Sequence, residues 1–197
     1  MKLLTVNHKL RDIIVYFTYK TRYLTEIRLV KMIYLAELCA IERLGKRLTD
    51  IEFKSYFYGP YSDEIATTGQ AISGEDIVME YKETNKGLYA TFFKTTKDKT
   101  CVEHLNDEEF EVLEQVARDW GFKPTKSIVM ATKESEPYKE TEFGDMIDLD
   151  KYKKDMDSTY RNEKLLTSVK QSMLEVQQGK GVLCATAEDI DSYLDSL

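Results

Sequence analysis

Apolar side chains recur at every third or fourth position in the first part of the chain, which is the spacing of one face of an α-helix. The pattern predicts a helix over roughly residues 7–22 and a second helix over residues 25–44, with Thr25 at the N-cap. Gly45 follows the last periodic residue, and glycine readily adopts the left-handed conformation that ends many helices. The apolar face of the second helix consists of Leu29, Met32, Ile33, Ala36 and Ala40.

The segment after the second helix combines a helix signal with a run of aromatic residues. Thr49–Glu52 has the spacing of a capping box, which predicts a short helical turn. An aromatic, strand-like segment runs from Phe53 to Tyr61 and contains a corner at Gly59–Pro60, because proline fixes its own φ and restricts the residue before it. Ser62 is placed to cap a third helix.

Two later segments alternate between apolar and polar residues, which is typical of half-buried strands. Residues 77–83 and 88–94 carry this pattern, and the turn-forming sequence of residues 84–87 separates them. The chain therefore predicts an antiparallel β-hairpin here. The side chains expected to face the core are Ile77, Met79 and Tyr81.

Helical patterns follow the hairpin and then give way to polar sequence. Asn106–Glu109 is a second capping-box spacing, and it begins a helix that Gly121 ends. Another helix begins at Thr125 and stops at Pro137. Residues 139–160 are polar and poorly periodic, which indicates a linker or partly ordered segment.

Apolar periodicity returns after Arg161 and predicts two amphipathic helices joined by a glycine hinge. We call their apolar face the tail stripe; it consists of Leu165, Val169, Met173, Val176, Ile190 and Leu194. Something must cover an apolar stripe. It either folds back on the rest of the chain or docks in a groove of a partner, and in the second case these six residues are the candidate partner-binding residues.

Together these patterns predict an α+β fold that is mainly helical, a helical bundle with one small antiparallel β-hairpin. The expected division is a domain over residues 1–145, a polar linker over 146–160 and a helical tail over 161–197. The chain has 197 residues, of which 42% are hydrophobic. This content is enough to form the hydrophobic core of a single domain.

Charge and cysteine content narrow the classes of partner and compartment. The formal net charge is −7 and the sequence pI is about 5.1, so nucleic acid is an unfavourable partner. The 3 cysteines form no C-x-x-C pair, which favours free thiols in a reducing compartment. The N-terminus turns polar at once and no apolar run is long enough for a membrane span, so we expect a cytoplasmic protein without membrane contact.

The sequence offers no recognisable catalytic or cofactor chemistry. It contains neither a phosphate-binding glycine loop nor a G-x-S-x-G elbow. His8 and His104 are far apart in sequence and belong to no zinc pattern. The acidic positions Asp145, Asp148 and Asp150 lack the glutamate that an EF-hand needs at its twelfth position. We therefore expect no enzyme activity, cofactor or metal.

Three separated motifs resemble the Panacea-domain family, which includes SocA-like antitoxins and phage-associated proteins. They are the helical Lys31–Ala36, the aromatic Tyr56–Pro60 after the glycine linker, and, more loosely, Thr132–Tyr138. The sequence departs from the family pattern at Tyr56, where a Trp is usual, and at Lys133, where a His is usual. The resemblance covers roughly residues 8–145. The family-motif residues are Lys31, Tyr34, Tyr56, Tyr58, Gly59, Pro60 and Tyr61.

The resemblance implies an antitoxin of a toxin–antitoxin system that neutralises a cognate toxin by direct protein–protein binding. A protease or chaperone is the other kind of partner to test for. The tail resembles the C-termini of RelB- and Phd-type antitoxins. Alternatives are a proteolytic adaptor, a hydrolase whose site the sequence hides, and a DNA-binding regulator that uses the basic residues of the first 45 positions, Lys20, Arg22, Arg28, Lys31 and Arg43.

The aromatic cluster of Tyr56, Tyr58 and Tyr61 allows two interpretations. Alternate aromatic side chains can pack into the core while the others lie on a half-buried strand. Tyrosines also form recognition surfaces, because they supply a large contact area at low cost in conformational entropy.

Overall fold

The computed structural model describes residues 7–21, 24–84, 87–96 and 102–177. Residues 1–156 form one compact unit, and residues 157–197 form a second. The fold is α+β and mainly helical, as the sequence predicts. The helices are α1 (His8–Lys20), α2 (Glu26–Leu44), α3 (Asp63–Ala71), α4 (Asp107–Trp120), α5 (Thr125–Glu134), α6 (Glu136–Lys139) and α7 (Leu149–Gln177).

The strands form two small antiparallel sheets. One sheet has the strand order β1–β5–β4, and the other is the pair β2–β3. The bounds are β1 (Leu24–Thr25), β2 (Lys54–Tyr56), β3 (Gly59–Tyr61), β4 (Ile77–Glu83) and β5 (Tyr89–Thr95). The β4–β5 hairpin confirms the predicted one, whereas β2–β3 is a second hairpin where a single aromatic strand was expected.

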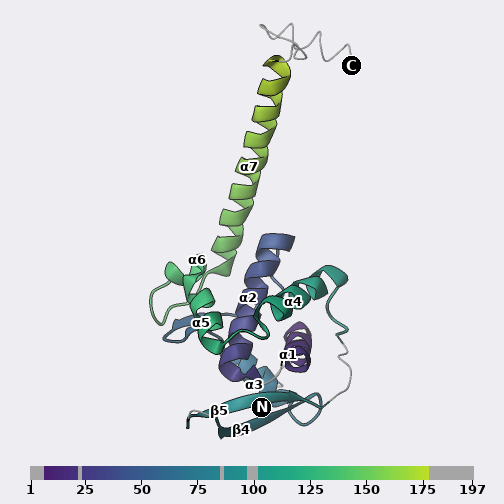
Figure 1. Cartoon of the computed structure of the whole chain (residues 1–197), viewed down its shortest axis with the longest axis vertical. Coiled ribbons are helices and arrows are strands. Elements are labelled where there is room, and N and C mark those ends of the chain that lie inside the picture. Colours follow the sequence, from purple (N-terminus) through teal and green to yellow (C-terminus); the bar gives the residue numbers. More distant parts are fainter. Residues whose placement is uncertain (1–6, 22–23, 85–86, 97–101, 178–197) are drawn as a thin grey trace. The chain divides into compact units, whose positions relative to one another are not determined.

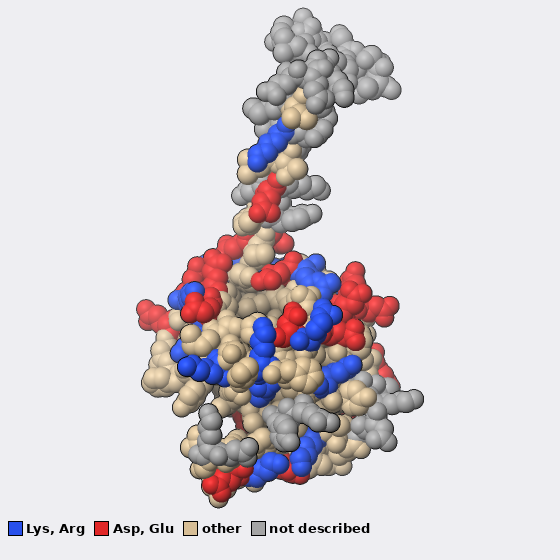
Figure 2. Space-filling view, viewed as in Figure 1, with Lys and Arg blue, Asp and Glu red and all other residues tan. Residues whose placement is uncertain are grey.

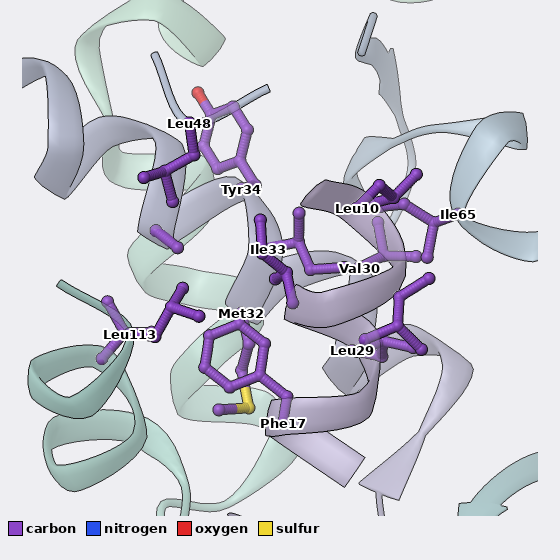
Figure 3. Close-up of a cluster of buried hydrophobic side chains, with 14 of the residues drawn as sticks. Leu10, Phe17, Leu29, Val30, Met32, Ile33, Tyr34, Leu48, Ile65 and Leu113 are labelled. Carbon is purple, nitrogen blue, oxygen red and sulfur yellow. The ribbon is translucent and has the colours of Figure 1, made fainter. Parts of the chain in front are cut away.

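Helix α2 lies at the centre of the first unit and packs against α1, α4, α5 and β3 (Figure 1). Its predicted apolar face is fully buried. Phe17 of α1 and Leu113 of α4 belong with Met32 and Ile33 to one buried core cluster (Figure 3). Each such buried side chain contributes about 1.5–3 kcal/mol. Gly45 ends α2 at φ 65°, which confirms the predicted left-handed cap.

The helical turn predicted at Thr49–Glu52 is wrong, because a distant carboxylate binds the backbone there. Glu37 of α2 is fully buried and accepts hydrogen bonds from the Leu48 amide at 2.9 Å and the Thr49 amide at 3.0 Å. The Thr49 hydroxyl donates to the same carboxylate instead of capping a helix. The extended link after α2 is therefore fixed by a long-range contact that local spacing does not reveal.

Among the described residues, the β4–β5 hairpin packs against the core at the end that contains Ile77. Ile77 is fully buried and Met79 packs against the core, but Tyr81 is 73% exposed, so its predicted core position is wrong. Tyr81 lies near the hairpin turn and stacks on Tyr89 with ring centroids 5.4 Å apart. The alternation of apolar and polar residues correctly predicts which side chains share a face of the sheet. How far the helices extend over that face depends on the tertiary structure.

The predicted linker is helical over most of its length. Helix α7 begins at Leu149, well before the expected start after Arg161. Ile147 and Leu149 are buried in the core, and the Ile147 amide donates to the Phe53 carbonyl at 2.8 Å. A few apolar anchors in an otherwise polar segment were enough to dock it, and they gave no periodic signal.

The continuation of α7 to Gln177 is the described part of the second unit. Four tail-stripe residues, Leu165, Val169, Met173 and Val176, belong to this helix, but their side chains lie outside the described part of the structure. Ile190 and Leu194 also lie outside the described residues. The predicted domain boundaries and the role of the tail stripe stay predictions.

Glu37→Ala should lower the free energy of unfolding by about 3 kcal/mol, because it leaves buried backbone donors without an acceptor. Urea unfolding measures this loss. Glu114→Ala, which removes an exposed carboxylate from α4, is the matched control and should change stability by less than about 0.5 kcal/mol. Equal effects of the two substitutions would show that Glu37 does not hold the link.

Candidate partner-binding surface

The β2–β3 hairpin turns tightly at Phe57 and Tyr58, and its strands pair Tyr56 with Gly59. Gly59 has φ +86°, a conformation that residues with a Cβ rarely adopt. A Cβ at this position would lie 2.9 Å from the Thr132 hydroxyl, so α5 approaches the hairpin backbone closely. The glycine of the aromatic motif is thus required both by the turn and by packing.

Three side chains from three helices donate to carbonyls of this hairpin. Tyr138 of α6 binds the Tyr56 carbonyl at 2.8 Å, and Lys133 of α5 binds the Phe57 carbonyl at 3.1 Å. On the other strand, the Lys31 ammonium of α2 binds the Pro60 carbonyl at 2.6 Å. The hairpin pairs only three residues a side, so these donors add support that so short a pairing does not supply.

Lys31 is only 2% exposed, which is unusual for a lysine. Burial, and secondarily the charge of Lys133, lowers the pKa of Lys31 to about 8. At neutral pH the ammonium is still largely protonated, so its bond to the Pro60 carbonyl is charge-assisted and strong.

A second set of contacts fixes the helices that hold the hairpin. The Tyr34 hydroxyl lies 2.9 Å from the Ser135 hydroxyl, which in turn donates to the Thr132 carbonyl at 2.7 Å. Burial raises the pKa of Tyr34 to about 12, so the phenol stays protonated. The Tyr34 ring also packs edge-on against Phe53 at 5.2 Å. The three separated motifs therefore meet around one hairpin.

The aromatic side chains at the turn point into solvent. The exposed fraction is 41% for Tyr56, 77% for Phe57 and 69% for Tyr58. Phe143, 60% exposed, joins them with its ring 4.7 Å from Phe57 and 5.8 Å from Tyr56. We call these four residues the aromatic surface. The interpretation that these tyrosines pack into the core is wrong for Tyr56 and Tyr58, whereas Tyr61 is partly buried against the core.

Phe143 was missed because it lies in a segment interpreted as a linker, where a single aromatic residue carries no periodic signal. Its position follows from the backbone: the Ser55 amide donates to the Asp145 carbonyl, and the Gly144 amide donates to the Ser55 carbonyl. These bonds place residues 142–146 beside β2 as if they were a further strand.

An apolar groove of about 370 Å³ lies between the hairpin and the start of α2. Its main lining residues are Ile27, Val30, Tyr56, Phe57, Tyr58 and Tyr61. Ile27 is 42% exposed, so apolar surface from α2 continues that of the hairpin. Such a groove suits an apolar side chain of a partner rather than acid–base or nucleophilic chemistry.

The two histidines, distant in sequence, meet in space without forming a metal site. The rings of His8 and His104 stack with centroids 4.8 Å apart. His104 also contacts buried Asp12, whose carboxylate accepts the amides of Glu103 and His104 at 2.8 Å each. These bonds attach the segment before α4 to α1. Within the described ranges, no cluster of three or more His, Cys, Asp or Glu residues could hold a metal ion.

Two of the five basic residues suggested for DNA binding, Arg28 and Lys31, are buried inside the protein. Arg28 donates to the carbonyls of Gly121 and Lys123, and Lys31 is buried against the hairpin. Lys20 lies over the Tyr16 ring. Among the helices of the described residues, none is long and apolar enough to cross a membrane.

Gly59→Ala should destabilise the fold by about 1–3 kcal/mol more than Gly74→Ala, because only the first Cβ would be crowded. Both glycines have positive φ, and a Cβ at Gly74 meets nothing within 4 Å, so this control isolates the packing against Thr132. Thermal or urea unfolding of both variants gives the difference. Equal losses of unfolding free energy in the two variants would mean that α5 moves away to accommodate the new methyl group.

Stability should depend on pH through Lys31. Its folded pKa of about 8 lies below the ordinary 10.5, so between these values the unfolded chain binds more protons. The stability of the parent protein relative to Lys31→Met should therefore rise from pH 8 to 10, by up to about 1.4 kcal/mol per unit. Urea unfolding across this range measures the difference; a flat or falling difference would contradict the low pKa.

Residues 29–139 match the family described as antitoxin SocA-like, Panacea domain. The match begins in α2 and ends with the last residue of α6, so it contains the β2–β3 hairpin and all three side chains that donate to it. A comparison with curated proteins finds no match. Since the matched region covers more than half of the chain, the protein belongs to the SocA-like antitoxin family and carries its Panacea domain.

Proposed function

We propose that this protein neutralises a cognate toxin by binding it directly, as one half of a cytoplasmic toxin–antitoxin system. Membership of an antitoxin family supports a partner that is a toxin. The observation that carries the proposal is the aromatic surface, whose two most exposed rings stand on a hairpin held by three helices.

The physics of interfaces favours this surface as a contact site. Aromatic side chains dominate the binding energy of many interfaces, and they do so best beside a pocket that excludes water. A backbone that is already fixed loses little entropy on binding. The hairpin satisfies both conditions, because its carbonyls are bound from behind while its rings and the apolar groove face outward.

The tail stripe is a second proposed contact with the toxin. Leu166 and Leu174 of α7, which are not stripe residues, are 58% and 49% exposed, so this helix presents further apolar side chains within the second unit. An amphipathic helix of this kind can dock in a groove of a partner protein. We propose a binding role rather than an enzymatic one for both surfaces.

Co-expression with candidate toxins, taken from the reading frames beside the gene, tests the proposal. Phe57→Ser with Tyr58→Ser, and separately truncation after Ser158, should each abolish rescue of growth. Both proteins should keep a cooperative melt, since the rings are exposed and the truncated chain retains the core anchors Leu149 and Met156.

The matched control is Tyr81→Ser with Tyr89→Ser, which removes exposed rings from the other hairpin and should leave rescue intact. Rescue by the Phe57 and Tyr58 variant would exclude the aromatic surface from toxin binding. Rescue by the truncated protein would exclude the tail stripe. If the truncated protein unfolds, the tail belongs to the core.

A further inference from the structure

Two grooves of different character lie near the aromatic surface. The apolar groove lies toward α2. Phe143 belongs to the segment whose neighbouring residues line a second groove of about 370 Å³. We call it the acidic groove; its lining includes Glu136, Glu140, Glu142, Asp145, Met146 and Asp148. Figure 2 shows carboxylates gathered over α6 and the first turns of α7.

Several of these carboxylates are available to a partner. Glu136, Glu142 and Asp145 are exposed, and in the described part of the chain no ion pair involves them. The lysine in the groove, Lys151, already binds Glu140 at 2.7 Å.

The two lysines whose ammonium groups bind the hairpin do not offset this charge at the surface. Lys133 donates to the Phe57 carbonyl, and Lys31 is buried against the Pro60 carbonyl. Neither ammonium is directed at the acidic groove. The aromatic surface thus stands next to several negative charges that have no cation of their own.

Negative charge also borders the apolar groove. Glu26 is one of its lining residues. Burial first, and then the charges of Glu26 and Asp63, raise the pKa of Tyr61, which places both carboxylates in the electrostatic environment of that ring. Asp63 has one exposed partner, Lys54, at 3.8 Å, and such a pair is weak in water.

We propose that the aromatic surface receives a basic segment of a partner protein, with an apolar side chain in the apolar groove and flanking lysines or arginines on the carboxylates of the acidic groove. This inference rests on the proposed role of the aromatic surface in toxin binding and specifies the chemistry of the toxin segment. A phosphate backbone or an anionic lipid surface does not fit, because the same carboxylates repel it.

The two kinds of contact should contribute differently to binding. Charged residues at the edge of an interface mainly raise the association rate and make it sensitive to salt. Desolvated aromatic anchors mainly slow dissociation. The apolar groove and rings therefore supply affinity, whereas the acidic groove selects a basic segment over a neutral or acidic one.

Fluorescence anisotropy with the full chain and two labelled probes tests the inference. The probes are an amphipathic peptide of leucine and lysine and a matched peptide of leucine and glutamate. Only the lysine peptide should bind. Phe57→Ser with Tyr58→Ser should weaken its affinity by about tenfold or more. Glu142→Gln with Asp145→Asn should weaken it at low salt and remove most of its salt dependence.

The control is Glu108→Gln with Glu114→Gln, which makes the same change of net charge on exposed residues of α4 and should leave the affinity nearly unchanged. Equal weakening by both charge variants would overturn the inference, because the whole acidic protein would then attract the peptide. Binding of the glutamate peptide, or of neither, would also overturn it. So would sedimentation showing a dimer that the Phe57 and Tyr58 variant dissociates, since a second copy would then occupy the surface.

The same variants in the co-expression assay separate the two proposals. If the Phe57 and Tyr58 variant loses rescue while Glu142→Gln with Asp145→Asn keeps it and the lysine peptide does not bind, the basic-segment inference fails and toxin binding by the aromatic surface stands. If every variant keeps rescue, the aromatic surface is not the toxin-binding site, and both proposals fail.

Discussion

The buried ammonium of Lys31 is the contact on which the exposed hairpin depends. A lysine in the core is costly unless its charge is bound, and the carbonyl of Pro60 is its acceptor. Pro60 pairs with Ser55, whose amide and carbonyl bind Asp145 and Gly144, so the Pro60 carbonyl faces away from β2 and accepts from another element. Lys31 holds the Pro60 carbonyl against α2, the central helix of the first unit.

Helix α2 also determines how the chain reaches the hairpin. Glu37, just under two turns after Lys31, binds the amides of Leu48 and Thr49 and so fixes the link that leads to β2. One helix therefore uses a buried ammonium and a buried carboxyl group to control the two ends of the same segment. Both groups bind backbone rather than each other, so each depends on the path of the chain being correct.

This construction explains how a two-stranded hairpin can display large aromatic rings. An isolated hairpin of this length is at best marginally stable in water. Here the hydrogen bonds from Lys133 and Tyr138 add to that of Lys31, and the segment around Phe143 lies along β2. The resulting surface is apolar at its centre and acidic at its edge, an arrangement suited to recognising a protein of opposite charge.

The sequence by itself determined the parts that depend on neighbours along the chain. These include the buried face of α2, its Gly45 cap, the capping box at Asn106 and the β4–β5 hairpin, since helix and strand periodicity are local properties. The convergence of the three motifs on one hairpin, the capture of Thr49 by Glu37 and the exposure of Tyr58 were decided only by the tertiary structure. Each depends on a group many residues away, and neither propensity nor spacing carries that information.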